Sequence, residues 1–261
     1  MNREKLTPVE ILEKVALIIQ DIGKGAALCG GMAAYALGLE SESHITPVFT
    51  EDVDIVVDTK SKKFPLFDAK DVNLAKRLID AGYKPELNAL PTSKALPNEK
   101  WVYSDNSHYV EFLTEDHRKM THKISGITAQ GLSYFSMRLD NTIRITLPSG
   151  AKLTIVAPAA FIMHKLLTFP LRKKEAKKYK DLYYVCYVLS NGGDKSATLQ
   201  SICDLNIHPK WKDTARNNLK NVMDGIGLNA KRISQADDTG WLTEFLTTIL
   251  LNEINTSLTQ R

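Results

Sequence analysis

The sequence predicts an α+β fold, in which a β-sheet with flanking helices is followed by an α-helical C-terminal region. In the first part of the chain, short runs of β-branched and apolar residues alternate with segments of helical periodicity. From Pro158 onward the pattern becomes helical. We therefore expect two domains, residues 1–157 and residues 158–261.

The first helix is predicted from a capping motif. Thr7 is expected as the N-cap, Pro8 at the first helical position, and Glu10 as the residue that completes a capping box. Apolar residues then recur at helical spacing as far as Ile19.

Three segments follow that frame the candidate site. The apolar run 26–29 indicates a buried strand, and Gly30 and Gly31 turn the chain into a second helix over residues 32–39. Residues 52–58 are predicted to form a strand because they are rich in β-branched residues.

The remainder of this half is predicted to contain a helix, a loop and several strands. Residues 71–82 look helical, with Gly82 as the C-cap, and residues 84–100 are expected to be loop with some strand because they hold three prolines. Further strands are expected, of which the last two form a hairpin, at residues 101–103, 109–113, 142–147 and 152–156.

The C-terminal half is predicted to contain helices at residues 159–169, 172–189, 211–225 and 241–258. The last of these carries an apolar stripe that should face the core, made of Leu242, Phe245, Leu246, Ile249, Leu250 and Ile254.

Composition places the chain among ordinary soluble proteins. Of its 261 residues, 43% are hydrophobic and 25% are charged, and no apolar run reaches the roughly 20 residues that span a bilayer. Residues 1–14 carry charges throughout and lack the apolar core of a signal peptide. We expect a cytoplasmic protein with no membrane attachment. The net charge of +4 is compatible with an anionic substrate but does not establish one.

Two aspartates on the predicted strand 52–58 suggest a metal site. Residues i and i+2 of a strand point to the same face, so Asp52 and Asp54 should project side by side. Two negative charges at such a short distance repel each other unless a cation lies between them. Magnesium is the expected cation, because it favours carboxylate and phosphate oxygens.

The two glycines suggest a phosphate site. Without a Cβ, Gly30 and Gly31 let phosphate oxygens approach backbone N–H groups at a helix N-terminus. An anion cradle beside a two-carboxylate metal site is suited to phosphoryl transfer on an NTP. Either motif alone is weak, since an isolated pair of alternating aspartates is more often a solvated face. Their order and spacing favour the functional interpretation.

Gly30-Gly31 followed by Asp52-Val53-Asp54 resembles the signature of the DNA polymerase β-like nucleotidyltransferase superfamily. The resemblance implies a mixed β-sheet of the nucleotidyltransferase type, glycines and Thr50 at the substrate, and Mg²⁺ on the two aspartates. It also implies a third acid, best matched by Glu111, as metal ligand or base. The alternative for Glu111 is an edge-strand carboxylate that faces water.

Residues 156–166 and 180–183 resemble the AbiEii-like branch of this superfamily, and the resemblance covers about residues 24–190. It implies that Lys165 and Asp181 are active-site residues, with Lys165 at the triphosphate. The alternative for Lys165 is a solvated helix residue. The branch includes toxins of toxin–antitoxin systems, so the resemblance favours tRNA or protein as acceptor and implies a cognate antitoxin as partner. A small molecule such as an aminoglycoside is the alternative acceptor.

Two departures from the family pattern keep other functions open. Many relatives carry an arginine before the first aspartate, and this chain does not; it also lacks the second acid after Asp181. The alternatives to an active transferase are a catalytically degenerate nucleotide-binding module and a metal-dependent nuclease.

Residues 172–180 include six basic residues, which either contact a phosphate chain or form a solvated helix face.

Overall fold

The computed structural model divides the chain into two compact units, each described here by itself. Residues Met1–Ala33 and Thr50–Val156 form the first, called the sheet unit, and residues Ala34–Phe49 and Ala157–Arg261 form the second, called the helical unit. The structure describes residues 5–20, 22, 25–39, 41, 43, 45–48, 50–59, 72–88, 98–116, 118 and 120–259.

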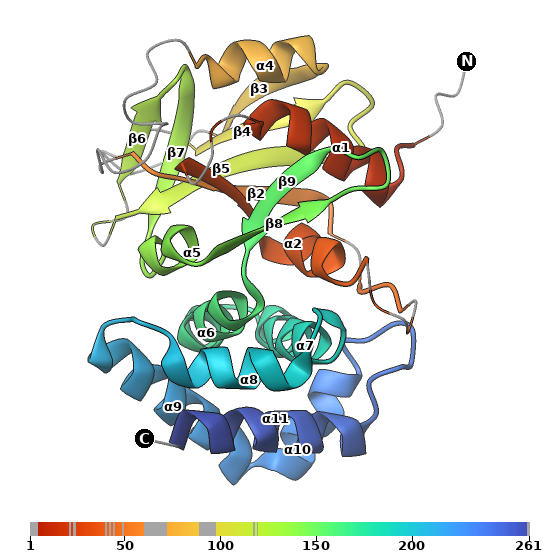
Figure 1. Cartoon of the computed structure of the whole chain (residues 1–261), viewed down its shortest axis with the longest axis vertical. Coiled ribbons are helices and arrows are strands. Elements are labelled where there is room, and N and C mark those ends of the chain that lie inside the picture. Colours follow the sequence, from red (N-terminus) through yellow and green to blue (C-terminus); the bar gives the residue numbers. More distant parts are fainter. Residues whose placement is uncertain are drawn as a thin grey trace. The chain divides into compact units, whose positions relative to one another are not determined.

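The sheet unit is built on a mixed β-sheet, for which the described residues supply nine strands in the order β3-β4-β5-β2-β1-β9-β8, with β7 pairing both β5 and β6 (Figure 1). The central pairs β2–β5 and β1–β9 are parallel, whereas β1–β2 is antiparallel. The strands are β1 (Ala26–Cys29), β2 (Asp52–Val57), β3 (Tyr83–Asn88), β4 (Asn98–Tyr103), β5 (Tyr109–Glu115), β6 (Thr121–Ile124), β7 (Ile127–Leu132), β8 (Thr142–Thr146) and β9 (Lys152–Val156). With the helices below, this confirms the predicted α+β class.

Helix α1 (Pro8–Ile19) begins as the sequence predicts. The Thr7 hydroxyl accepts a hydrogen bond from the Glu10 backbone N–H at 3.3 Å, and the Thr7 N–H donates to the Glu10 carboxylate at 2.7 Å. The buried residues of α1 pack it against β9. The capping box therefore fixes where the helix starts, and apolar periodicity fixes its buried face.

Two further helices belong to the sheet unit. Helix α4 (Leu74–Asp80) starts later than predicted, because the Asn73 side chain caps it by accepting from the Lys76 N–H at 2.8 Å. The predicted start, Asp71, lies outside the described residues. Helix α5 (Ser136–Asp140) packs against β1 and β2 and was missed, since five residues are too few to show helical periodicity. Helix α2 (Gly30–Leu37) carries residues of both units.

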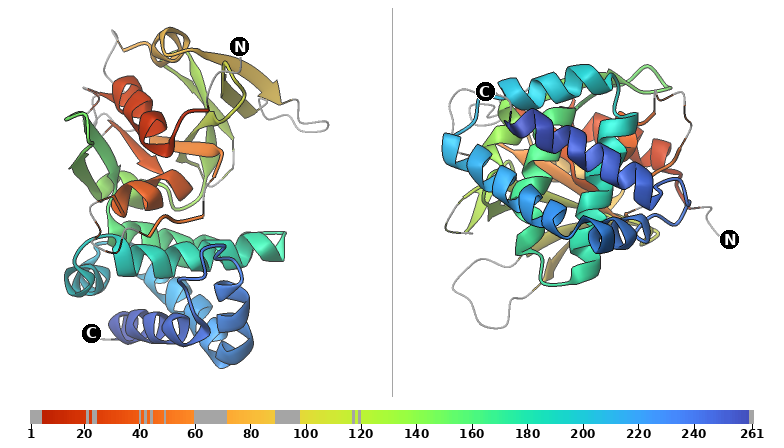
Figure 2. Two further views of the ribbon diagram at one scale, coloured as in Figure 1. Left: turned by 90° about the vertical axis from the view of Figure 1, so that its right-hand side faces the viewer. Right: turned by 90° about the horizontal axis from the view of Figure 1, so that it is seen from below.

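The helical unit is a bundle in which α6 pairs with α7, and α11 packs on α8, α9 and α10 (Figure 2). Helices α8 and α10 were not predicted; α8 is capped by Asp194, whose side chain accepts from the Ala197 N–H at 3.1 Å. The elements are α6 (Pro158–Thr168), η2 (Phe169–Leu171), α7 (Glu175–Asn191), α8 (Lys195–Asp204), α9 (Pro209–Asp224), α10 (Ile226–Ser234) and α11 (Glu244–Thr259).

The segment Ala34–Phe49 groups with the helical unit, although the prediction of consecutive domains places it in the first. Tyrosine side chains of α7 form hydrogen bonds with the backbone of this segment. The Tyr183 hydroxyl accepts from the Val48 N–H at 3.2 Å, and the Tyr187 hydroxyl donates to the Ile45 carbonyl at 2.8 Å. Such long-range pairing has no signature in the local sequence.

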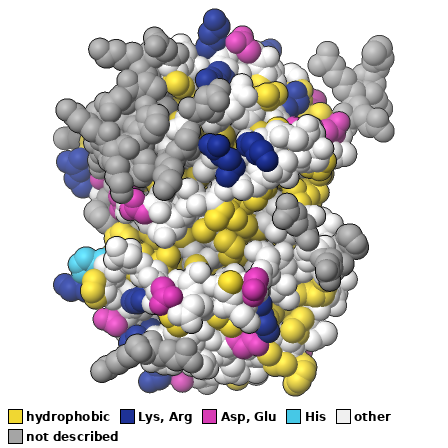
Figure 3. All heavy atoms as spheres, in the orientation of Figure 1, with side chains coloured by type: hydrophobic (Ala, Val, Ile, Leu, Met, Phe, Trp, Pro, Cys, Tyr) yellow, Lys and Arg dark blue, Asp and Glu magenta, His cyan; other side chains and the backbone are white. Residues whose placement is uncertain are grey.

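The predicted apolar stripe of α11 is wrong in part. The helix begins at Glu244, and Phe245 lies 77% exposed on the side away from the bundle. The buried face follows Thr247, Leu250, Leu251, Ile254 and Leu258. On the face drawn in Figure 3, acidic and basic side chains are interspersed over the helical unit.

Across the described residues, every helix is too short or too polar to span a lipid bilayer.

Candidate active site

Strand β2 presents two carboxylates from one face. Asp52 and Asp54 are half-buried, whereas the alternating residues Val53 and Ile55 are fully buried. Because side chains alternate along a strand, the apolar pair fixes β2 in the core and leaves both aspartates on the other face. The i, i+2 spacing in the sequence therefore becomes a shared direction in the structure.

A third carboxylate lies on the neighbouring strand. Strands β2 and β5 are parallel, and their register pairs Asp54 with Glu111 and Asp52 with Tyr109. Directly paired residues project from the same face of a sheet, so Glu111 stands beside the two aspartates. Strand β5 lies between β2 and β4, which excludes the interpretation of Glu111 as an edge-strand residue.

Gly30 lies against this carboxylate face. It follows β1 with a φ of +71°, a left-handed conformation that glycine adopts without strain. A Cβ at this position would overlap the Asp54 carboxylate. Glycine is therefore required at position 30 for two reasons. The turn into α2 needs a left-handed backbone, and the Asp54 carboxylate occupies the space that a Cβ would fill. Gly31 follows in the first turn of α2, and Thr50 lies half-buried two residues before Asp52.

The residues present fit a divalent ion of the magnesium type. Such an ion prefers oxygen ligands, and carboxylate oxygens project together from this face. The absence of a side chain at Gly30 leaves room for one of them, the Asp54 carboxylate. No group of three or more His, Cys, Asp and Glu side chains within the described residues is already arranged as a metal site. Asp52 and Asp54 are thus the candidate primary ligands, and Glu111 the candidate third.

Lys100 is a residue of this face that the sequence analysis missed. It is paired in register with Glu111, and its ammonium lies 3.8 Å from the Glu111 carboxylate and 3.8 Å from the centre of the Tyr109 ring. Partial burial lowers the pKa of Lys100, but the Tyr109 hydroxyl, Glu111 and Asp52 outweigh burial and raise that pKa. Lys100 lies at the end of a segment expected to be mostly loop, so only the strand register reveals its partner.

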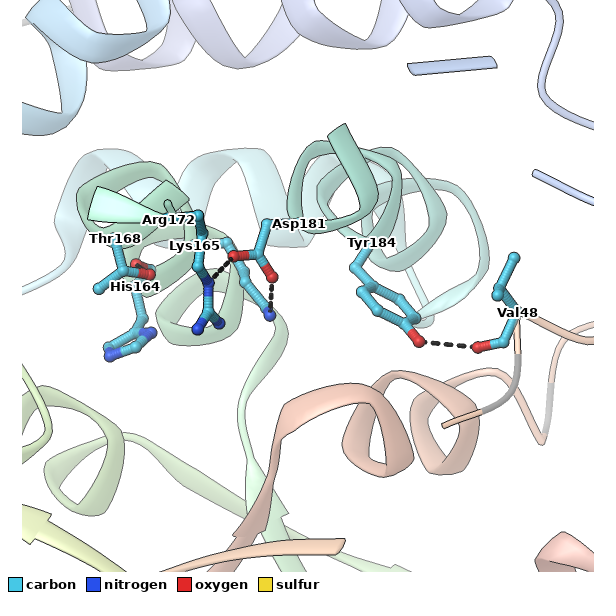
Figure 4. Close-up of polar contacts among 7 residues, drawn as sticks. All are labelled: Val48, His164, Lys165, Thr168, Arg172, Asp181 and Tyr184. Carbon is cyan, nitrogen blue, oxygen red and sulfur yellow. Dashed lines mark hydrogen bonds and ion pairs between the residues drawn. The ribbon is translucent and has the colours of Figure 1, made fainter. Parts of the chain in front are cut away.

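A second cluster of charges lies within the helical unit (Figure 4). Lys165 of α6 donates to one carboxylate oxygen of Asp181 on α7, and the Arg172 Nε donates to the other at 2.7 Å. The side chains of Lys165 and Asp181 are only 6% and 7% exposed, whereas Arg172 is 44% exposed. Two cations thus share one buried carboxylate.

Aromatic rings surround the Lys165 ammonium. It lies 5.5 Å from the centre of the Tyr184 ring and 5.7 Å from that of Phe161, within the range of cation–π attraction. The Tyr184 hydroxyl donates to the Val48 carbonyl at 2.7 Å (Figure 4). Burial would raise the pKa of Asp181, but Lys165 and Arg172 outweigh it and hold that pKa below its ordinary value.

The predicted site residues therefore form two groups, each within one unit. Gly30, Asp52, Asp54 and Glu111 lie together in the sheet unit, and Lys165 lies against Asp181 in the helical unit. Arg172 was not distinguished in sequence from the other basic residues of 172–180. Residues 173–177 of that run are exposed, as the solvated-face interpretation expects.

Comparison with known proteins decides the family. A family model described as Nucleotidyltransferase matches residues 10–193, which is more than half of the chain. The chain belongs to this nucleotidyltransferase family. The match includes every residue assigned to the two groups above, and the protein is accordingly an enzyme of the nucleotidyltransferase family. No curated protein gave a significant match to its sequence.

Two solved structures align with most of this nucleotidyltransferase at low identity. An antigenic nucleotidyltransferase-like protein from Paracoccidioides brasiliensis is 12% identical over 88% of this chain and 93% of its own, with a TM-score of 0.45. The CdnE cyclic dinucleotide synthase of Elizabethkingia meningoseptica, solved with GTP and Apcpp, is 13% identical over 96% and 91%, with a TM-score of 0.25.

Proposed function

We propose that this nucleotidyltransferase is Mg²⁺-dependent and moves a nucleoside monophosphate from an NTP to an acceptor hydroxyl. The observation that carries the proposal is the carboxylate face of the sheet unit, where Asp52, Asp54 and Glu111 project beside the strand–glycine–helix turn at Gly30. Carboxylates that lie so near one another are stabilised by a cation, which can also bind phosphate oxygens.

Each residue of the carboxylate face has a proposed role. Asp52 and Asp54 hold the ion, which when bound neutralises charge on the phosphates and polarises the α-phosphoryl group. Glu111 either completes the ligand set or accepts the proton of the acceptor hydroxyl. The backbone N–H groups that follow Gly30 and Gly31 face the triphosphate at the start of α2, and Thr50 contacts the substrate.

The AbiEii-like resemblance gives Lys165 a role in the reaction. We assign Lys165 to the triphosphate, where an ammonium stabilises charge that develops on the departing pyrophosphate. Asp181 fixes the direction of Lys165 through their hydrogen bond. Arg172 is the second cation at Asp181, and its side chain is more exposed than that of Lys165.

The proposed reaction is a single displacement. The acceptor oxygen forms a bond to the α-phosphorus, the bond from that phosphorus to the β-bridging oxygen breaks, and pyrophosphate leaves with the electron pair. The hydroxyl proton passes to Glu111 or to solvent. Nucleotide and acceptor are thereby joined by a phosphodiester.

The AbiEii-like resemblance of residues 24–190 makes tRNA and protein the first acceptors to test, followed by hydroxylated small molecules such as aminoglycosides. In that assignment the protein acts as the toxin of a toxin–antitoxin system and has a cognate antitoxin.

Isotope transfer tests this function. The protein is incubated with Mg²⁺ and each NTP, labelled at either the α- or the γ-phosphate, together with total tRNA, cell protein or an aminoglycoside mixture. The proposal expects α-label on one acceptor class, release of γ-label in pyrophosphate, and loss of both in Asp52→Asn/Asp54→Asn. Transfer of γ-label, or cleavage of polynucleotide without NTP consumption, would replace it with a kinase or a nuclease.

A further inference from the structure

The carboxylate face already contains a cation of its own. The Lys100 ammonium lies 3.8 Å from the Glu111 carboxylate, and the two side chains are only 28% and 21% exposed. Their strands are paired in register, so both project from the same face as Asp54, the partner of Glu111 on the other side. Partial burial means that solvent and salt screen these charges less than they screen exposed pairs.

The Lys100 ammonium has two partners on this face. Its ammonium contacts Glu111 and also lies over the ring of Tyr109, which is the register partner of Asp52. If Glu111 turns toward an ion, the Tyr109 ring still holds the ammonium by cation–π attraction. Lys100 can therefore release Glu111 without leaving the sheet surface.

We propose that Lys100 is a built-in counter-cation that competes with a divalent ion for Glu111 and so lowers the ion affinity of the free protein. The inference rests on the proposed function, because it takes the carboxylate face as the ion site. In the free protein, Lys100 is paired with Glu111, the third carboxylate of the proposed site. Lys100 is thereby a positioning residue for Glu111, with no direct contact to substrate implied.

The test is binding of Mn²⁺, a spectroscopic substitute for Mg²⁺, by the full-length protein without nucleotide, followed by electron paramagnetic resonance of the free ion. The variants are Lys100→Gln, which removes the charge, and Lys100→Arg, which keeps it. Lys76→Gln is the matched control, because Lys76 is an exposed lysine of α4 in the same unit. Circular dichroism establishes that each variant is folded.

Lys100→Gln is expected to lower the dissociation constant for Mn²⁺ by about tenfold or more, because it removes a unit positive charge that repels a divalent ion on the same partly buried face. Lys100→Arg and Lys76→Gln should stay within about twofold of wild type, because neither changes the charge on the face. The gain should shrink in high salt.

An unchanged or weaker affinity in Lys100→Gln would overturn the competition while leaving the ion site intact, provided that wild-type binding is lost in Asp52→Asn/Asp54→Asn. Absence of Mn²⁺ binding by both wild type and Lys100→Gln would overturn the inference and the proposed ion site together. Binding by Lys100→Gln alone would support the competition strongly.

Discussion

Replacing Asp181 with asparagine tests whether the cluster in the helical unit is a compensated buried ion pair. The change keeps the size of the side chain and one oxygen acceptor but removes the negative charge. Lys165 is then left as a buried ammonium whose side chain is 6% exposed and faces aromatic rings. Arg172 is 44% exposed and can turn to solvent, so the penalty falls mainly on Lys165.

Loss of one partner from a buried pair costs about 3–5 kcal/mol of unfolding free energy, whereas an exposed pair contributes only about 0–1 kcal/mol. We therefore expect Asp181→Asn to destabilise the helical unit by about 3–5 kcal/mol. Adding Lys165→Met to Asp181→Asn should recover about 2 kcal/mol or more of unfolding free energy. The second change removes the uncompensated ammonium and replaces it with a thioether, which packs well against aromatic rings.

The assay is urea unfolding followed by far-ultraviolet circular dichroism at neutral pH. The matched control is Asp213→Asn, the same chemical change in an exposed i, i+3 pair with Arg216, which should alter stability by less than about 0.5 kcal/mol. Two results would refute the reasoning: a cost of Asp181→Asn below about 1 kcal/mol, or further destabilisation when Lys165→Met is added.

Three other predictions concern single positions. Gly30→Ala should abolish metal-dependent NTP binding, because the added Cβ would overlap the Asp54 carboxylate. Gly150→Ala is the control, since Gly150 has a similar left-handed φ but open space around it. Its unfolding curve should show only the backbone cost of about 1 kcal/mol. Burial lowers the pKa of His108 from 6.5 to about 4, so between these two pH values the unfolded chain binds a proton that the folded protein does not bind. Stability should fall by up to about 3 kcal/mol as the pH drops from 6.5 to 4, and urea curves of His108→Gln should lack that loss. Gly38→Ala should lower the melting temperature by overlap with the Tyr187 hydroxyl, and Tyr187→Phe should restore part of it; an additive double mutant would contradict this contact.

Much of the fold was predictable because the signals are local. The capping box at Thr7 and Glu10 fixes the start of α1, and apolar content locates β1 and β2. The short strands β6 and β7 were missed because both show too little alternation: β6 contains no buried residue, and β7 begins with a run of buried residues. Helix α10 follows Gly225 directly and includes Gly227, and both residues weaken a helical prediction.

The candidate site was predictable only where its residues lie close in sequence. The spacing of Asp52 and Asp54 predicts a shared face, because the period of a strand is known in advance. The pairing of Glu111 with Lys100 depends on the register of β4 and β5, which the sequence does not state. The contact of Arg172 with the Asp181 carboxylate likewise depends on how the chain turns between α6 and α7, which the local sequence does not specify.

The most direct test of the central claim is a calorimetric titration of each NTP, with and without Mg²⁺, into the wild-type protein and into Asp52→Asn/Asp54→Asn. The account predicts that one NTP binds only with Mg²⁺ present and that the folded variant does not bind it. Binding that persists in the variant, or no binding of any NTP by the folded wild type, would contradict the assignment of β2 as the metal and nucleotide site.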